Sequence, residues 1–252
     1  MTKLEIKRWG TAALGLFLAS LVGCQNNSKT IHYPNGEKSE ISYVKNDSFN
    51  LIRKDYYSTG IIKSLFHLKD SLFNGLNEEY YRSGKLESKG YWHLGKKKGW
   101  FYFYDSIGNL DKAIEYLPFR DSSVSKPNQI IHFTINGDTI KNGQSIYYEY
   151  YSTKDTIKLN KETFTFKIVL AGHKYENAYI GFCDFDDQFN LPDHKPCPVT
   201  EMDNYSILLN PRAYHLGENK ITGYIVNMEK PLGENGGKFI EIFFSRKFYV
   251  VP

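Results

Sequence analysis

The sequence lacks the short motifs that mark many enzymes. It contains no Gly-x-Ser-x-Gly nucleophile elbow, no glycine-rich phosphate-binding loop and no His-Glu-x-x-His metal motif. Two Ser-x-x-Lys matches, at Ser42 and Ser123, lie outside any helical pattern and lack the partner motifs of that chemistry. The seven histidines are scattered singly, and a lone histidine is more often a surface or core residue than a ligand. The sequence therefore predicts a protein that is not an enzyme and that holds no cofactor or metal.

The chain also lacks a strong net charge. The formal charge of the 252 residues is +4, and removal of an N-terminal signal with three basic residues and Glu5 leaves +4 − (3 − 1) = +2. Nucleic-acid binding calls for a concentrated basic face. We therefore expect no nucleic-acid partner.

The N-terminal apolar stretch, residues 9–23, is too short for a confident membrane span. It follows Lys3, Lys7 and Arg8 and ends in Leu-Val-Gly-Cys24, a pattern that resembles a bacterial lipoprotein signal with its lipobox. The resemblance implies a signal peptide at residues 1–23, acyl chains on Cys24 and a tether at residues 24–30. It also implies a membrane partner through that lipid anchor, in the cell envelope, with Gln25 favouring the outer membrane. An uncleaved anchor helix with a chance cysteine is the alternative.

Cysteine is scarce, with three in the chain. Once Cys24 is assigned to lipid, Cys183 and Cys197 remain as an even pair in an exported chain, which predicts a disulfide worth about 3 kcal/mol. The alternative is a metal site that adds His194 and the acidic residues near Asp186. That segment lacks the Cys-x-x-Cys spacing of zinc sites and the glycine turn and closing glutamate of calcium loops. The disulfide is therefore favoured.

What the sequence does contain is a repeat. Four glycines recur every 24 residues, and tyrosine precedes three of them by three positions: Gly36, Gly60, Gly84 and Gly108, with Tyr33, Tyr57 and Tyr81. Strand-like runs at residues 61–68 and 76–82 flank polar turn material, so each unit is predicted to be a β-hairpin with its glycine at positive φ in the turn. Because 24 is even, equivalent residues should share a face, and the tyrosines should form a ladder.

Residues 90–101, Gly-Tyr-Trp-His-Leu-Gly-Lys-Lys-Lys-Gly-Trp-Phe, resemble a MORN repeat. The longer frame at residues 33–116 resembles the bacterial MORN variant often catalogued as a toxin–antitoxin antitoxin component. The resemblance implies an elongated, single-layer β-meander over residues 31–117 that serves as a scaffold and carries no catalytic residues. An antitoxin role fits poorly, because a lipobox would remove the chain from the cytosol.

The 24-residue period fails after residue 117, and a polar, proline-containing stretch predicts a linker at residues 118–128. Eight short β-rich runs follow, the first at residues 129–135, which predicts a β-sandwich over residues 129–252. Residues 214–225 weakly resemble the turn into a late strand of immunoglobulin-like domains. The predicted fold class is therefore all-β, with a repeat meander followed by an immunoglobulin-like sandwich.

Aromatic residues make up 16% of the chain and are the remaining candidates for a binding surface. Trp92, Trp100, Tyr102 and Tyr104 fall on neighbouring predicted strands and form a candidate ligand face. The alternative, which the sequence favours, is that they form the core of a thin sheet. We expect a non-enzymatic envelope scaffold that binds another envelope protein, with glycan binding through the aromatic face as the alternative function.

Overall fold

The structure is a computed structural model that describes residues 28–44, 47–117, 125–141, 143–152, 154–191, 197–209, 215–235 and 237–252. These residues form strands connected by turns and loops, and the described part of the chain contains no helix that could cross a membrane. The predicted all-β fold class is confirmed. Cys24 and the predicted signal segment lie outside the described residues.

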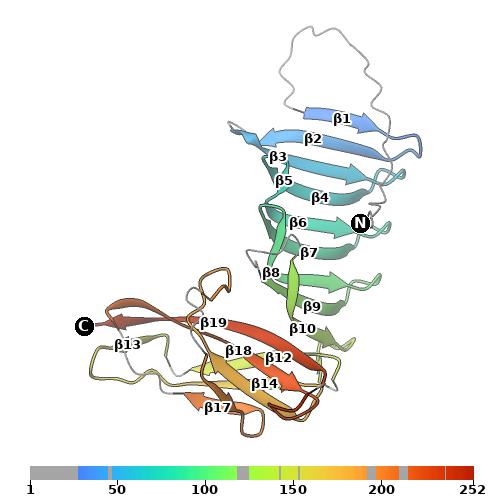
Figure 1. The fold of residues 1–252 in the computed structure, drawn as a ribbon. Coiled ribbons are helices and arrows are strands. Elements are labelled where there is room, and N and C mark those ends of the chain that lie inside the picture. The colour runs from blue at the N-terminus through green and yellow to red at the C-terminus, as the bar shows by residue number, and fades with distance from the viewer. Residues whose placement is uncertain are drawn as a thin grey trace, which may run out of the picture.

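The first half of the chain forms one long antiparallel sheet in which nearly every strand pairs with the next strand in sequence (Figure 1). The exception is β5, a short strand that pairs with β4 beside the longer β6. The strands are Ser28–His32 (β1), Lys38–Val44 (β2), Asp47–Tyr56 (β3), Ile62–Lys69 (β4), Leu72–Phe73 (β5), Gly75–Tyr80 (β6), Leu86–His93 (β7), Lys96–Tyr104 (β8), Leu110–Leu117 (β9), Lys126–Phe133 (β10) and Thr139–Ile140 (β11).

The repeated glycines lie in the hairpin turns that connect strands along one lateral side of this sheet, and all have positive φ. The values are +82° at Gly36, +85° at Gly60, +82° at Gly84 and +100° at Gly108. In each turn the glycine N–H donates to the carbonyl oxygen three residues earlier, over 2.9 to 3.1 Å. A residue with a Cβ would be strained in this left-handed conformation.

A fifth turn of the same kind lies at Gly137, where φ is +86° and the N–H donates to the Thr134 carbonyl over 2.9 Å. Its distance from Gly108 is 137 − 108 = 29 residues, so five extra residues break the 24-residue period. The segment predicted as the first strand of the second domain is β10, which instead pairs with β9 of the long sheet. The expected domain boundary at residue 129 therefore falls inside the repeat sheet, and the second part begins later in the chain.

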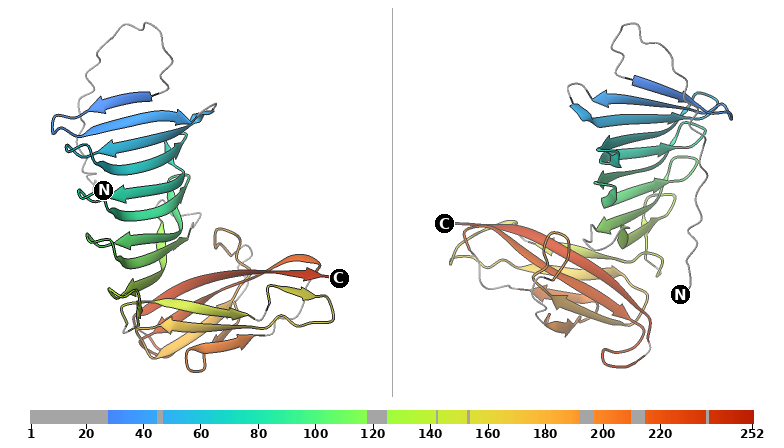
Figure 2. Two further views of the ribbon diagram at one scale, coloured as in Figure 1. Left: turned by 180° about the vertical axis from the view of Figure 1, so that it is seen from behind. Right: turned by 45° about the horizontal axis from the view of Figure 1, so that its top comes forward.

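The second part consists of two smaller sheets. The three-stranded sheet contains Tyr147–Ser152 (β12), Phe166–Gly172 (β14) and Ser206–Leu209 (β17). The five-stranded sheet contains Thr156–Lys158 (β13), Phe239–Val251 (β19), Gly217–Met228 (β18), Asn177–Phe182 (β15) and Val199–Glu201 (β16), in that order. Figure 2 shows these sheets gathered at one end of the repeat sheet.

The two smaller sheets share one hydrophobic core. On β14, Phe166, Ile168 and Leu170 are buried while the intervening Lys167 is exposed, as the alternation of the sequence predicts. From the other sheet, residues such as Ile225 complete the same cluster. Burial of each such side chain contributes about 1.5–3 kcal/mol. The immunoglobulin-like connectivity stays a prediction.

Strand β10 joins the repeat sheet to both smaller sheets. Its Ile130 exchanges two backbone hydrogen bonds with Ile146, of 2.9 and 2.7 Å. The Asn128 amide pairs with the backbone of β19, donating to the Phe243 carbonyl over 2.8 Å and accepting from the Phe243 N–H over 2.7 Å. Neighbouring Gln129 accepts from the N–H of Tyr148 over 3.0 Å. The two halves are thus connected by strand-like hydrogen bonds as well as by the chain.

Candidate functional site

The four aromatic residues predicted as one ligand face lie on both faces of the repeat sheet. On β7 and β8, Trp92 pairs with Lys97 and Lys89 pairs with Tyr102. Residues 89 and 92 are three apart on β7, and side chains alternate along a strand, so Trp92 and Tyr102 point to opposite sides. Trp100 shares the side of Tyr102. We call the two sides the Trp92 face and the Tyr91 face, after neighbouring residues of β7.

The Trp92 face carries a continuous row of aromatic rings. Their centroids lie 4.9, 5.0, 6.0 and 5.2 Å apart in the order Phe66, Phe73, Trp92, Phe101 and Tyr116. The row crosses from β4 to β9, and each such ring pair can add about 0.5–1.5 kcal/mol beyond its area burial. These rings therefore supply apolar packing that a single-layer sheet would otherwise lack.

The aromatic row depends on Gly90, a glycine that lies inside strand β7 and not in a turn. Gly90 pairs with Phe101 across β7 and β8, and a Cβ at position 90 would lie 2.3 Å from the Phe101 ring. The ring covers the position where a side chain is missing, and Phe101 is only 4% exposed. Absence of a side chain at Gly90 therefore allows the aromatic row to lie close to the sheet.

Lys97 extends its ammonium group over this row. Its Nζ lies 4.8 Å from the centroid of Tyr116, 5.0 Å from Phe101 and 5.7 Å from Trp92. These distances allow cation–π attraction. Burial lowers the pKa of Lys97, while the carboxylate of Glu79 acts in the opposite direction. Among the described residues, no ion pair or hydrogen bond involves this ammonium.

A hollow of about 80 Å³ lies beside the ammonium on the same face. Aromatic rings form much of its wall, and polar side chains complete it. The lining residues are Phe66, Asn77, Glu79, Ser88, Gly90, Trp92, Lys97, Phe101 and Phe103. Small-molecule sites also combine an apolar wall with a few convergent polar groups, but at volumes of about 300–1,000 Å³, so this hollow has room for only one small group of a ligand.

Asn77 lines this hollow and carries an unpartnered donor. The side chain is 4% exposed, and its Oδ1 accepts the N–H of His67 over 2.9 Å. Its Nδ2 has no hydrogen-bond partner in the described part of the chain. A buried amide nitrogen left without a partner costs about 1–3 kcal/mol, so this group is a strong candidate for contact with a ligand or with water.

Glu79 belongs to a row of polar cross-strand pairs that the sequence analysis missed. Ser88 Oγ donates to Glu79 Oε2 over 3.0 Å, and one repeat earlier Ser64 Oγ donates to Asp55 Oδ2, also over 3.0 Å. The sequence contains a signal for these pairs, because their members recur at the 24-residue period: 79 − 55 and 88 − 64 both equal 24. The third repeat places Phe103 opposite Lys112 at the equivalent positions. The hollow thus lies where the polar pair of Glu79 and Ser88 meets the aromatic row.

The Tyr91 face carries an exposed apolar patch of its own. Leu76 and Tyr91 are cross-strand partners and are 45% and 48% exposed. Leu72, in β5, and Leu94, in the turn after β7, are similarly exposed. We call these four residues the Tyr91 patch. Exposed patches of this kind often mark interaction surfaces.

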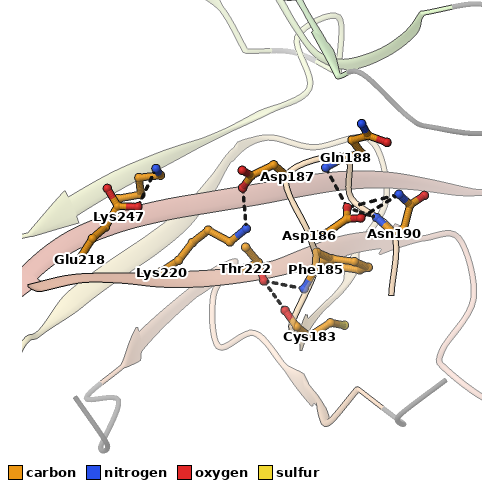
Figure 3. A network of polar contacts seen from close by, with 10 residues as sticks. All are labelled: Cys183, Phe185, Asp186, Asp187, Gln188, Asn190, Glu218, Lys220, Thr222 and Lys247. Carbon is orange, nitrogen blue, oxygen red and sulfur yellow. Dashed lines mark hydrogen bonds and ion pairs between the residues drawn. The ribbon is translucent and has the colours of Figure 1, made fainter. Parts of the chain in front are cut away.

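Cys183 and Cys197 form a disulfide beside β15. Figure 3 shows Cys183 and the polar contacts of the loop that follows it. Polar groups stabilise the described part of the loop that the disulfide closes, residues 184–191. Asp186 accepts the N–H groups of Gln188 and Asn190 over 2.8 and 2.9 Å. Hydrogen bonds from Asn190 hold the pKa of the Asp186 carboxyl below its ordinary value. Asp186 therefore takes part in a turn, and His194, the histidine of the alternative metal site, lies outside the described residues.

The neighbouring acid of that loop is also paired, since Asp187 contacts Lys220 over 3.0 Å. No group of three or more histidine, cysteine, aspartate or glutamate side chains in the described ranges could hold a metal ion. The arrangement of this loop is thus that of a stabilised surface turn, and the hollow on the Trp92 face is the stronger candidate site.

No protein-family model matches the chain, and no curated protein or solved structure is significantly similar to it. The resemblances to lipoprotein signals and to MORN repeats therefore stay predictions. The fold itself defines a class: an all-β protein with one long antiparallel sheet joined to two smaller sheets that share a core.

Proposed function

We propose that this protein is a non-enzymatic scaffold of a bacterial cell envelope, held at the outer membrane by acyl chains on Cys24, that binds another envelope protein. The observation that carries this proposal is the Tyr91 patch, an exposed apolar surface on a long sheet that is connected through β10 to a second β unit. The disulfide supports export, because such bonds persist in oxidising compartments.

The geometry suits a scaffold for a further reason. Hydrogen bonds from β10 to β12 and β19 hold the second unit against the end of the repeat sheet. A partner that contacts the sheet would therefore meet a surface with little conformational entropy to lose on binding.

Site-specific photocrosslinking in intact membranes tests this function. We expect a photoreactive amino acid at Tyr91 to give a discrete protein adduct. The same probe at Tyr249, which is equally exposed but lies on β19, should give none. Leu76→Glu should remove the adduct, because a charge in the apolar contact would have to be desolvated. Equal adducts from both positions, or no adduct from position 91, would contradict the proposal.

Binding of a cell-wall glycan is a second candidate function. The hollow on the Trp92 face favours it, because aromatic rings and unpaired polar groups converge there. This differs from the predicted aromatic face, since Trp100 and Tyr102 lie on the other side of the sheet.

A further inference from the structure

We propose that the hollow beside Gly90 binds the acetamido group of an N-acetylhexosamine unit in a glycan. This inference rests on the second candidate function, glycan binding, and it specifies the face, the residues and the chemical group. An acetamido group combines a carbonyl acceptor, an N–H donor and a methyl group. The hollow offers a counterpart to each of the three.

The donor for the acetamido carbonyl is Asn77 Nδ2. The orientation of the Asn77 amide is fixed, because only its oxygen can accept the N–H of His67, and that hydrogen bond is 2.9 Å long. The NH₂ group must then point away from His67, and it has no partner among the described residues. An acceptor from a ligand would satisfy this buried donor.

The acceptor for the acetamido N–H is Glu79. One of its carboxylate oxygens accepts from Ser88, and a carboxylate has about four acceptor positions in total. Lys97 lines the same hollow and adds further donors. The site thus contains one carboxylate and one ammonium, a balance that favours a neutral ligand with both donors and acceptors over a simple anion or cation.

The methyl group and the sugar ring would contact aromatic side chains. Phe66, Phe103 and Trp92 line the hollow, and apolar C–H groups pack well on aromatic rings. A volume of 80 Å³ has room for about two to three waters at about 30 Å³ each. A four-atom acetamido group fits this space, whereas the pyranose ring would remain at the rim, against Trp92.

Tryptophan fluorescence of the full chain with Trp9→Phe and Trp100→Phe tests the proposal, because Trp92 is then the only tryptophan of the three. Chitotetraose, an N-acetylglucosamine tetramer, should change this fluorescence saturably. Cellotetraose, which lacks the acetamido groups, should bind at least about tenfold more weakly, as expected for the loss of two hydrogen bonds.

Variants identify the site. Lys97→Met keeps the aliphatic stem on the rings and removes the ammonium, and Asn77→Asp keeps the acceptor for His67 and removes the donor. Each should weaken chitotetraose binding about tenfold. Lys89→Met is the matched control, since Lys89 also lies over an aromatic ring, Tyr102, but on the opposite face. It should bind like the parent protein. If Asn77→Asp does not unfold cooperatively, it has lost the native fold, and the comparison of Lys97→Met with Lys89→Met then tests the site by itself.

Three results would overturn the proposal: no saturable change up to about 10 mM chitotetraose, equal affinity for cellotetraose, or equal effects of Lys97→Met and Lys89→Met.

Insoluble peptidoglycan sacculi distinguish the source of the sugar. Retention on sacculi that chitotetraose competes away indicates the cell wall, and chitotetraose binding without retention indicates another polysaccharide; both support the acetamido site. The crosslink from Tyr91 is independent of these assays, so the scaffold and the glycan site can fail separately.

Discussion

At the scale of single residues, glycine serves two distinct physical purposes in the repeat sheet. Gly60 has φ of +85°, and a Cβ there would meet nothing within 4 Å, so only the backbone conformation requires glycine. Gly90 lies inside a strand, and a Cβ there would meet the Phe101 ring at 2.3 Å. The first requirement belongs to the turn, whereas the second belongs to side-chain packing between strands.

We expect Gly90→Ala to destabilise the protein by about 1–3 kcal/mol, the usual effect of overpacking a well-packed site. The new methyl group would overlap the Phe101 ring and displace it from the aromatic row. Urea denaturation followed by circular dichroism measures the change.

The matched test is the double variant Gly90→Ala with Phe101→Leu. Because leucine is smaller and more flexible than the ring, the double variant should lose less stability than the sum of the two single variants. Additive losses would show that Gly90 matters for a reason other than the contact with Phe101.

At the scale of elements, the repeats are connected by side chains as well as by strand pairing. The Tyr57 hydroxyl donates to the Tyr80 carbonyl over 2.7 Å, and one repeat later the Tyr81 hydroxyl donates to the Tyr104 carbonyl over 2.6 Å. These two turn tyrosines thus reach the end of a strand one repeat onward. This link requires the tyrosine hydroxyl. It therefore gives a physical reason for tyrosine at these positions that the 24-residue spacing alone does not give.

The disulfide connects the end of β15 to the segment that leads into β16, two strands that pair with each other. We expect its loss, in a Cys183→Ser and Cys197→Ser variant, to destabilise the protein by about 2–4 kcal/mol, because the 14-residue separation no longer restricts the unfolded chain. Comparison of urea midpoints with and without the two substitutions measures this loss.

The control for this experiment is a reductant added to both proteins. Reductant should lower the urea midpoint of the parent protein and leave the double-serine variant unchanged. In a Cys24→Ser background, titration of the unreduced protein should find no free thiol. Two free thiols would contradict the disulfide.

At the scale of the whole molecule, one strand determines how the two halves are joined. β10 pairs with β9 in the repeat sheet, and its side chains reach β12 and β19. Glu115 supports the junction by accepting from Asn128 and Gln129 over 2.6 and 2.7 Å. Burial, and to a lesser degree the Glu115 carboxylate, raises the pKa of Tyr148 at this junction. The amide groups of Asn128 and Gln129 are thus buried and paired.

We expect Asn128→Ala to loosen the junction and to destabilise the protein by about 2–4 kcal/mol, because the two hydrogen bonds between the Asn128 amide and the backbone of Phe243 would be lost. Small-angle X-ray scattering should show a broader distribution of interatomic distances. Asn109→Ala is the control, since the Asn109 side chain donates a hydrogen bond to Asp105 within one turn of the repeat sheet, away from the junction. An unchanged scattering profile for Asn128→Ala would show that the backbone bonds of Ile130 suffice.

Much of the repeat sheet could be predicted from the sequence because its signals are local. Gly36, Gly60, Gly84 and Gly108 mark turns whose conformation depends on a few consecutive residues. Gly137 was missed because five extra residues shift it out of the period. The strand that precedes it, β10, was assigned to the wrong half of the molecule for the same reason, since pairing with β9 depends on residues that a local pattern does not register.

The candidate site was predictable only in part. Trp92 stands out by composition, but its side of the sheet differs from that of Trp100 and Tyr102. A shift of register between Gly90 and Tyr91 changes which residues of β8 lie opposite β7. Asn77 and Lys97 carry no motif. They become candidates only because the fold brings them to one hollow and leaves the Asn77 amide nitrogen without a partner.

By itself, then, the sequence determined the all-β class and the repeated turns, because the conformation of a glycine turn and the alternation of a strand depend on near neighbours. It also indicated the pairing of Cys183 with Cys197 by elimination. Tertiary structure alone decided which strand joins the halves and which side chains meet over Gly90. Those features depend on the register between strands and on contacts between residues far apart in the chain, which no local pattern of residues specifies.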